Sequence, residues 1–297
     1  MIKNLIDIES LSVDDIAQIY TRAQEFEKGI RKSNHINANV INMFFENSTR
    51  TKLSFEMAEN KLNAHKYDFC AQTSSIQKGE ELYDTINNLS AIGMDVFVMR
   101  HIENNLVKEL SEKKYYKDIA FVNAGSGTNS HPTQALLDFY TMKKHFMNLS
   151  GKTITIVGDI AHSRVAKSNI ALLKKTDMNI RCLAPENMMG EKIEGVSYFT
   201  NLKEAFEEAD IVMALRIQRE RIKECIDIEE YISKYQITKD NLPYAAFLMH
   251  PGPVNRNIEI QSDVLEMQNA KTILTQARNG VYVRMAILDI ILASMGL

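Results

Sequence analysis

The chain has 297 residues, of which 45% are hydrophobic and 25% charged, a composition that suits two folded domains of ordinary size or one large one. Thirty-five basic residues against 38 acidic ones give a formal net charge of −3, which excludes a general attraction to nucleic acid or to an anionic membrane. The three cysteines form no CxxC pair, and no apolar run is long enough for a membrane span or a signal peptide, so we expect a cytoplasmic protein.

Short apolar runs alternate with helical patterns through the first half of the chain. Three of these runs are predicted strands, at residues 40–45, 96–99 and 120–122. Helical spacing of apolar residues recurs between them, at residues 53–62, 82–89 and 106–110. This alternation favours parallel strands joined by crossover helices.

The same alternation restarts after a long helical pattern at residues 132–146. Four more runs are predicted strands, at residues 153–157, 180–183, 211–215 and 246–249. The chain ends in an apolar helical pattern at residues 281–295, whose spacing alone does not assign it to either half. We predict an α/β fold of two doubly wound domains with parallel sheets, joined by interdomain helices. The domains are expected at residues 1–144 with 276–297 and at residues 145–275.

The polar segment Ser48-Thr49-Arg50-Thr51 directly follows the first predicted strand and opens a helix. Backbone N–H groups lack helical partners at the start of a helix, and the helix dipole is positive there, so such a turn favours an anion. The hydroxyl groups add donors, and the planar guanidinium of Arg50 matches a phosphate group. The alternative is that Ser48 or Thr49 only caps the helix.

Two further segments of the first half carry cations. Ser74 and Lys78 stand four residues apart in a polar loop, a pattern that is also typical of an ordinary surface loop. Arg100 follows the predicted strand at residues 96–99. It therefore lies at the carboxyl end of a parallel strand, where open α/β sheets gather their ligands.

His131 precedes Pro132 at the start of the long predicted helix, and Gln134 follows one turn later. The imidazole of His131 could donate a hydrogen bond to an oxygen that gains negative charge. The alternative is an ordinary surface histidine beside a helix cap.

Two arginines of the second half hold corresponding positions. Arg164 opens the helix after the strand at residues 153–157, and Arg216 follows the strand at residues 211–215. Each could bind a carboxylate bidentately, which suits a substrate with two carboxylates. The last predicted strand ends in His250-Pro251-Gly252-Pro253, which suggests either a rigid loop, with a cis Gly252-Pro253 bond as one option, or a plain structural turn.

Taken in order, these segments resemble the carbamoyltransferase family, and most closely its aspartate-specific members, from about residue 41 to residue 288. The resemblance is carried by the succession of Ser-Thr-Arg-Thr, Ser-x-x-x-Lys-Gly-Glu, Met-Arg-His, His-Pro-Thr-Gln, Val-Gly-Asp, Arg-x-Gln-x-Glu-Arg and His-Pro-Gly-Pro. It implies transfer of the carbamoyl group from carbamoyl phosphate to the amino group of L-aspartate, as in pyrimidine biosynthesis. It also implies a homotrimer with shared active sites, and neither a cofactor nor a metal.

The resemblance assigns residues to each substrate. Carbamoyl phosphate is expected to contact Ser48, Thr49, Arg50, Thr51, Ser74, Lys78, Arg100, His131, Gln134, Pro251, Gly252 and Pro253, with Ser74 and Lys78 supplied by a neighbouring subunit. The groups expected to act on the reacting atoms are Arg50, Thr51, Arg100, His131 and Gln134. Aspartate is expected to contact Lys78, Arg164, Arg216 and Gln218. On domain closure, Glu46 is expected to pair with Arg164 and Arg221.

The chemistry of these residue types agrees with that reaction. Attack of the amine builds negative charge on the carbonyl oxygen, and each donor fixed there lowers the barrier by about 3 kcal/mol. Holding two small anions in line contributes the rest. The leaving phosphate can accept the proton of the amine, so no separate base is required.

Three alternatives are open. An ornithine carbamoyltransferase shares the phosphate half of the pattern, but carries His-Cys-Leu-Pro in place of His-Pro-Gly-Pro and lacks the Arg-x-Gln pair. A dinucleotide-dependent dehydrogenase is suggested by Val157-Gly158-Asp159, yet the GxGxxG fingerprint is missing. A non-catalytic anion-binding or scaffold protein leaves His131 and the two arginines unexplained. The sequence does not show whether a regulatory chain or another enzyme of the pathway binds the trimer.

Overall fold

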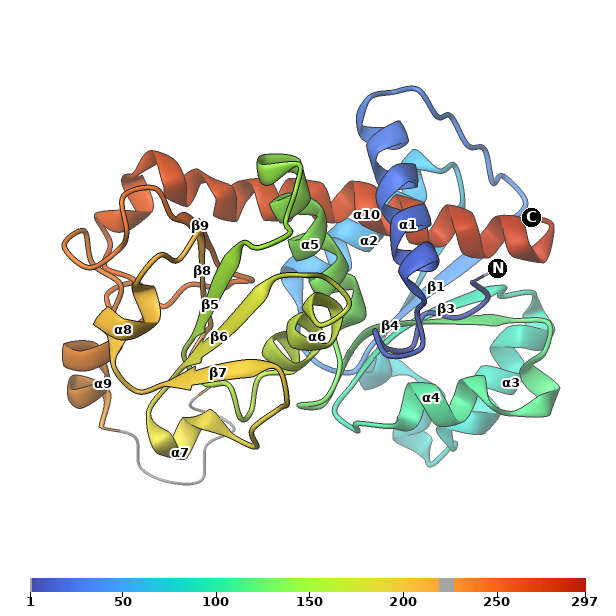
Figure 1. Ribbon diagram of the computed structural model, residues 1–297. Coiled ribbons are helices and arrows are strands. Elements are labelled where there is room, and N and C mark those ends of the chain that lie inside the picture. The colour runs from blue at the N-terminus through green and yellow to red at the C-terminus, as the bar shows by residue number, and fades with distance from the viewer. Residues whose placement is uncertain (1, 219–226) are drawn as a thin grey trace. The chain divides into compact units, whose positions relative to one another are not determined.

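The computed structural model describes residues 2–218 and 227–297 (Figure 1). The chain divides into two compact units, Met1–Leu136 with Ala277–Leu297 and Leu137–Gln276. Both boundaries fall inside helices, one in α5 (Pro132–Phe146) and the other in α10 (Thr272–Met295). No helix in the described part of the chain combines the length and the apolar character that crossing a membrane requires.

The first unit is built on a four-stranded parallel sheet of order β2-β1-β3-β4. Its strands are β1 (Asn39–Phe44), β2 (His65–Phe69), β3 (Val96–His101) and β4 (Ala120–Ser126). Its other helices are α1 (Val13–Glu27), α2 (Thr49–Lys61), α3 (Leu82–Ile92) and α4 (Leu106–Ser111). Short 3-10 turns lie at Ala71–Thr73, Ser75–Lys78 and Lys114–Tyr116.

The core of the first unit lies around β3 and its neighbours β1 and β4. Phe97 and Phe121 face each other from β3 and β4, with ring centroids 5.6 Å apart, and both are fully buried. Ile86 of α3 and Leu110 of α4 pack against them. A parallel sheet covered by helices needs apolar side chains on both faces, which is why its inner strands are continuous apolar runs in the sequence.

The second unit contains a five-stranded parallel sheet of order β7-β6-β5-β8-β9. Its strands are β5 (Thr153–Val157), β6 (Asn179–Leu183), β7 (Val196–Phe199), β8 (Ile211–Ala214) and β9 (Phe247–Met249). Its helices include α6 (Arg164–Leu173), α7 (Glu186–Met189), α8 (Leu202–Phe206) and α9 (Ile228–Tyr235). Two 3-10 turns, Val264–Glu266 and Gln268–Lys271, precede α10. The predicted α/β class with two parallel sheets is confirmed.

A buried carboxylate attaches α10 to the N-terminal segments of the first unit. Asp289 is 1% exposed, and its side chain accepts hydrogen bonds from Arg22 of α1, from Nε of Arg31 at 3.1 Å and from Nε2 of His35 at 2.9 Å. Burial raises the pKa of Asp289, but the hydrogen bonds from His35, Ser33 and Arg22 outweigh it and bring the pKa to about 2. Asp289 is therefore ionised at neutral pH, and its removal would take away an acceptor that these donors share.

A second buried carboxyl group attaches α2 to β1. Glu59 is fully buried, and both of its oxygens lie within hydrogen-bond distance of Nδ2 of Asn42, at 3.0 and 2.9 Å. Burial raises the pKa of Glu59 to about 8, against the smaller lowering effect of the Asn42 hydrogen bond. The folded protein therefore holds a proton on Glu59 at neutral pH that the unfolded chain releases.

Glu59→Gln is expected to stabilise the protein at pH 8 and to change little at pH 5. The pKa of Glu59 rises from 4.5 to about 8 on folding, so the stability that the protonated group contributes is present below pH 4.5 and lost as the pH rises through 8. Glutamine has the same shape and no proton to lose. Urea unfolding should show the stability difference between variant and wild type growing by about 2 to 4 kcal/mol between pH 5 and pH 8. A difference that is independent of pH would contradict the burial of a protonated Glu59.

Candidate active site

In each sheet the strand order reverses at one place. The chain of the first unit passes from β1 outward to β2 and then continues with β3 on the other side of β1. In the second unit it passes from β5 to β6 and β7, and then continues with β8 on the other side of β5. Open α/β sheets bind ligands beyond the carboxyl ends of their strands at such reversals. Most of the residues singled out in the sequence follow the strands that flank these two places.

The segment Ser48-Thr49-Arg50-Thr51 follows β1 and forms the first turn of α2. Ser48 is the N-cap residue and has an extended backbone, with φ −157° and ψ 104°, but its side chain makes no capping hydrogen bond. Ser48 therefore takes the N-cap position that the alternative gave it, but its side chain does not cap the helix by a hydrogen bond. Thr51 is 7% exposed, whereas Arg50 is exposed. The turn thus combines an exposed guanidinium with the positive end of a 13-residue helix.

Arg100 lies in β3 beside the end of β1, in register with Phe44. Its Nε is 3.2 Å from Oε2 of Glu46, and the two side chains are 13% and 19% exposed. Its Nη1 also lies 3.5 Å from the carbonyl oxygen of Ala124 in β4. The structure therefore gives Glu46 a partner that the sequence did not suggest. Arg221, one of its two expected partners, lies outside the described residues, so its pairing stays a prediction.

His131 and Gln134 stand at the start of α5, after β4 and a short turn. The turn is closed by a hydrogen bond from the N–H of Ser126 to the carbonyl oxygen of Ser130, at 2.8 Å. His131 is 3% exposed and Gln134 is 8% exposed. The alternative that His131 is an ordinary surface histidine is therefore wrong. Since β1, β3 and β4 are neighbours in the sheet, the segments that carry Arg50, Arg100 and His131 emerge from adjacent strand ends.

The loop that carries Ser74 and Lys78 consists of two 3-10 turns. Ser74 donates from Oγ to the carbonyl oxygen of Ala71 at 3.0 Å, and Lys78 is exposed. Gly79 ends the second turn in the left-handed region, with φ 93°. Glu80 then accepts hydrogen bonds from Ser75 and others, which fixes the end of the loop. Within a single chain this is an exposed loop.

Arg164 is the first residue of α6, which follows β5. Ser163 caps this helix by accepting a hydrogen bond on Oγ from the N–H of Ala166 at 3.1 Å. Arg164 is 6% exposed, so its guanidinium lies at a buried helix start rather than on an open surface.

Arg216 and Gln218 follow β8, the neighbour of β5. Gln218 donates from Nε2 to the carbonyl oxygen of His162 at 3.2 Å, which joins this segment to the one before α6. His162 is itself held by Asp159, whose Oδ1 lies 3.1 Å from the backbone N and 2.9 Å from Nδ1 of His162. The segments that carry Arg164 and Arg216 therefore lie side by side at the reversal of the second sheet.

Glu259 holds this arrangement together and was not identified from the sequence. Its side chain is 1% exposed and accepts hydrogen bonds from the N–H of Ile217 at 2.9 Å and from the N–H and Nδ2 of Asn255, both at 2.8 Å. Burial raises the pKa of Glu259. The only signal in the sequence was an acidic residue between two isoleucines, Ile258 and Ile260, which by itself indicates no function.

The segment His250-Pro251-Gly252-Pro253 follows β9, which lies next to β8. The Gly252-Pro253 peptide bond is cis, so that option of the sequence analysis is confirmed. Gly252 has φ 73°, in the left-handed region that favours glycine. Its N–H donates to Nδ1 of His250 at 2.8 Å.

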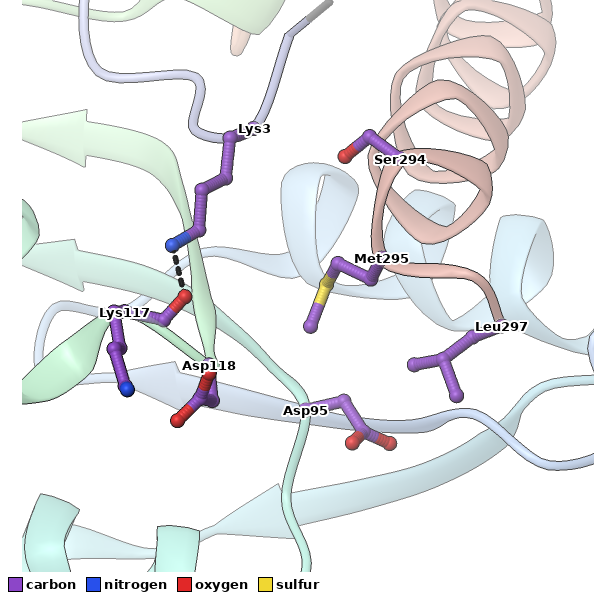
Figure 2. A pocket seen from close by; sticks show the side chains of 7 residues that line it. All are labelled: Lys3, Asp95, Lys117, Asp118, Ser294, Met295 and Leu297. Atoms are coloured by element: carbon purple, nitrogen blue, oxygen red, sulfur yellow. Dashed lines mark hydrogen bonds between the residues drawn. The ribbon is translucent and has the colours of Figure 1, made fainter.

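A separate cavity of about 480 Å³ lies in the first unit, away from these strand ends (Figure 2). It is lined by Lys3, Asp95, Lys117, Asp118, Ser294, Met295 and Leu297. Asp95 directly precedes β3 and Asp118 precedes β4, so the cavity lies at the amino ends of the strands. It contains none of the residues predicted to bind a substrate.

Comparison with known proteins matches both halves of the chain. Residues 3–144 match the model of the aspartate/ornithine carbamoyltransferase, carbamoyl-P binding domain, and residues 150–291 match that of the Asp/Orn binding domain. The aspartate carbamoyltransferase catalytic subunit of Pediococcus pentosaceus is 41% identical over 99% of this chain and 97% of its own. That of Ehrlichia canis is 42% identical over 97% of this chain and 95% of its own.

Solved structures show the same similarity. The catalytic subunit of M. jannaschii aspartate transcarbamoylase has a TM-score of 0.87 and 29% identity, and the match covers 99% of both chains. Aspartate transcarbamoylase from Trypanosoma cruzi, in complex with N-(phosphonacetyl)-L-aspartic acid, has a TM-score of 0.84 and 27% identity. That match covers 96% of this chain and 94% of the other.

Proposed function

Since the chain belongs to the aspartate/ornithine carbamoyltransferase family, we propose that it transfers the carbamoyl group of carbamoyl phosphate to the amino group of L-aspartate. The products are N-carbamoyl-L-aspartate and phosphate, as in pyrimidine biosynthesis. One observation carries the proposal: residues suited to phosphate follow the strands at the reversal of the first sheet, and two arginines with a glutamine follow those at the reversal of the second.

In this proposal the first unit binds carbamoyl phosphate. The phosphate contacts Ser48, Thr49, Arg50, Thr51 and Arg100. Thr51, Arg100 and His131 donate to the carbonyl oxygen, while Gln134 and the loop at Pro251 and Gly252 orient the carbamoyl NH2 group. We assign residues 1–144 with 276–297 to the carbamoyl-phosphate domain and residues 145–275 to the aspartate domain. The first family match, which ends at residue 144, supports the first of these boundaries. The grouping of Ala277–Leu297 with Met1–Leu136 in one compact unit supports the placement of the last helix, although the second family match extends to residue 291.

The reaction follows from these contacts. The nitrogen of the aspartate amine attacks the carbonyl carbon, and the bond from that carbon to the phosphate oxygen breaks. Negative charge builds on the carbonyl oxygen in between, and the donors fixed there stabilise it by about 3 kcal/mol each. The departing phosphate takes the proton of the amine.

Arg164, Arg216 and Gln218 bind the aspartate in this proposal, together with Lys78. Two guanidinium groups suit two carboxylates, whereas the ammonium group of ornithine would be repelled. An assay with aspartate and ornithine as separate acceptors tests this choice, since product is expected with aspartate alone. Turnover of ornithine at a comparable rate would favour the other branch of the family.

We also propose a cytoplasmic homotrimer in which Ser74 and Lys78 reach a neighbouring active site. The exposed edge strand β2 and helix α2 support such an interface, because Leu53, Met57 and Tyr67 on them are 57%, 48% and 44% exposed. The relatives are named catalytic subunits, which also supports an assembly of several chains. Sedimentation, and loss of specific activity on dilution, would test it.

Glu46→Gln is expected to raise the KM for aspartate far more than the KM for carbamoyl phosphate. The reason is that the family pattern pairs Glu46 with Arg164 and Arg221 when the domains close. The observed contact with Arg100 suggests a competing role. In that role Glu46 holds Arg100, which is expected to bind the phosphate, in place. Steady-state kinetics with each substrate varied in turn separates the two, because equal losses for both substrates would favour the role at Arg100.

A further inference from the structure

Two buried side chains of the second unit connect the end of β9 to helices α5 and α10. Gln276 of α10 is 2% exposed, and Asp138 of α5 is fully buried. Gln276 donates from Nε2 to Oδ1 of Asp138 at 2.7 Å, and its Oε1 accepts the N–H of His250 at 2.9 Å. One amide group thus bridges a carboxylate to the residue from which the Pro251-Gly252-Pro253 loop begins.

The direction of this amide is determined by its surroundings. Asn169 of α6 donates from Nδ2 to Oδ2 of Asp138 at 3.0 Å, and the same Nδ2 donates to the carbonyl oxygen of Val165, also at 3.0 Å. Asp138 therefore accepts a hydrogen bond on each oxygen. Gln276 must turn its NH2 group toward Asp138, which leaves its oxygen facing the N–H of His250.

His250 fixes the other side of the turn. It is 1% exposed, and its Nδ1 accepts the N–H of Gly252 at 2.8 Å. A ring nitrogen that accepts a hydrogen bond carries no proton, so the imidazole is neutral with its proton on Nε2. The loop is therefore held at its base through the backbone of His250 and at its tip through the backbone of Gly252.

We propose that Gln276, oriented by Asp138, and His250 are positioning residues that set the place of the Pro251-Gly252-Pro253 loop. This inference rests on the proposed function, in which the loop orients the carbamoyl NH2 group. None of the three residues needs to touch the substrate. A shift of about 1 Å in a group that orients a reactant can lower the rate about 100-fold.

Gln276→Leu removes both hydrogen bonds of the amide and is expected to lower kcat by about 100-fold. The matched control is Gln236→Leu, which removes another side-chain amide of the second unit, one that donates to the carbonyl oxygen of Asn257 at 2.7 Å. That control has no contact with the loop and should keep kcat within about twofold.

A donor–acceptor exchange tests the direction of the network. Gln276→Glu keeps an acceptor for the N–H of His250 but places a second carboxyl group against Asp138, so the pair must share a proton. This variant should be active near pH 6 and lose activity toward pH 8.5. Adding Asp138→Asn supplies an amide that donates to the new carboxylate and still accepts from Asn169. The double variant should regain kcat at pH 8.5 to within about tenfold of wild type.

Hydrogen exchange of the His250 and Gly252 amides gives a readout that does not depend on activity. Exchange should be faster in Gln276→Leu by about tenfold or more, and slow again in the double variant. If the wild-type protein shows no carbamoyl transfer, the proposed function is rejected. The exchange rates of the two amides would still test whether Gln276 positions the loop. Equal kcat and equal exchange in Gln276→Leu and Gln236→Leu would overturn the inference. The inference would also be overturned if the kcat of the double variant at pH 8.5 were no higher than that of Gln276→Glu. This second comparison remains valid even if Gln276→Leu does not fold.

Discussion

Arg50→Ala should lower kcat/KM for carbamoyl phosphate by about 10³-fold or more. Arg50 lies in the first turn of α2, where its guanidinium adds a full charge to the positive end of the helix. The phosphate gains charge as the carbamoyl group leaves, so a cation fixed beside it stabilises the transition state by several kcal/mol. Arg50→Lys keeps the charge but loses the planar pair of donors, and an intermediate loss of about 30-fold is expected. Steady-state kinetics with varied carbamoyl phosphate measures both variants.

Lys61→Ala is the matched control for this experiment. Lys61 lies in the last turn of the same helix and is exposed there, where a cation also interacts favourably with the helix dipole. Its loss weakens the helix slightly without touching the candidate site, so kcat/KM should stay within about twofold. If Arg50→Ala and Lys61→Ala behaved alike, the role of Arg50 at the phosphate would be rejected.

Arg216→Ala should raise the KM for aspartate by about 100-fold or more and change the KM for carbamoyl phosphate little. Arg216 follows β8 at the reversal of the second sheet, and the contacts of Glu259 to Ile217 and of Gln218 to His162 hold its neighbours in place. A guanidinium makes two charge-assisted hydrogen bonds to a carboxylate, each contributing about 1.5 to 3 kcal/mol. Their loss affects only the substrate that carries the carboxylate.

Arg256→Ala provides the control for the second unit. Arg256 is 58% exposed and lies 3.9 Å from Glu266, an arrangement typical of a surface ion pair with a small energetic effect. Both KM values should match those of the wild type. Should Arg216→Ala weaken both substrates equally, Arg216 would have to act on the whole site instead of on aspartate.

The buried strands could be predicted from the sequence, including the edge strands β4 and β9, whereas the exposed edge strands could not. All seven predicted strands exist, since a strand covered on both faces needs a run of apolar residues. Strands β2 and β7 were not predicted; both lie at the edges of their sheets, and their residues are largely exposed or half-exposed. Their polar residues show neither an apolar run nor a clear alternation. Helix α10 begins at Thr272, whereas its predicted start was residue 281. The predicted start was too late because Asn279 and Gly280 are residue types typical of helix ends.

The candidate site was predictable where chemistry is carried by short motifs at strand ends. Ser48-Thr49-Arg50-Thr51, Arg100 and Arg216 each follow an apolar run, and strand order brings such segments together. The supporting residues carry no such signal. Glu259 and Gln276 act through hydrogen bonds to backbone groups that are distant in sequence, and the Glu46 contact with Arg100 joins two different strand ends. These pairings arise only on folding, and in the sequence a single polar residue of a helix or loop cannot be told from solvated surface.

The unit that contains Ser48 to Thr51 is not a continuous piece of chain, and this affects how it is made. A ribosome synthesises Met1–Leu136 first, but Ala277–Leu297 belongs to the same unit and emerges last. The intervening Leu137–Gln276 is contiguous and can fold while translation continues. Until α10 arrives, Arg22, Arg31 and His35 lack the carboxylate of Asp289, and the surface that packs against Ile287 and Ile291 stays open. The first unit can therefore be completed only after all of the second has been synthesised.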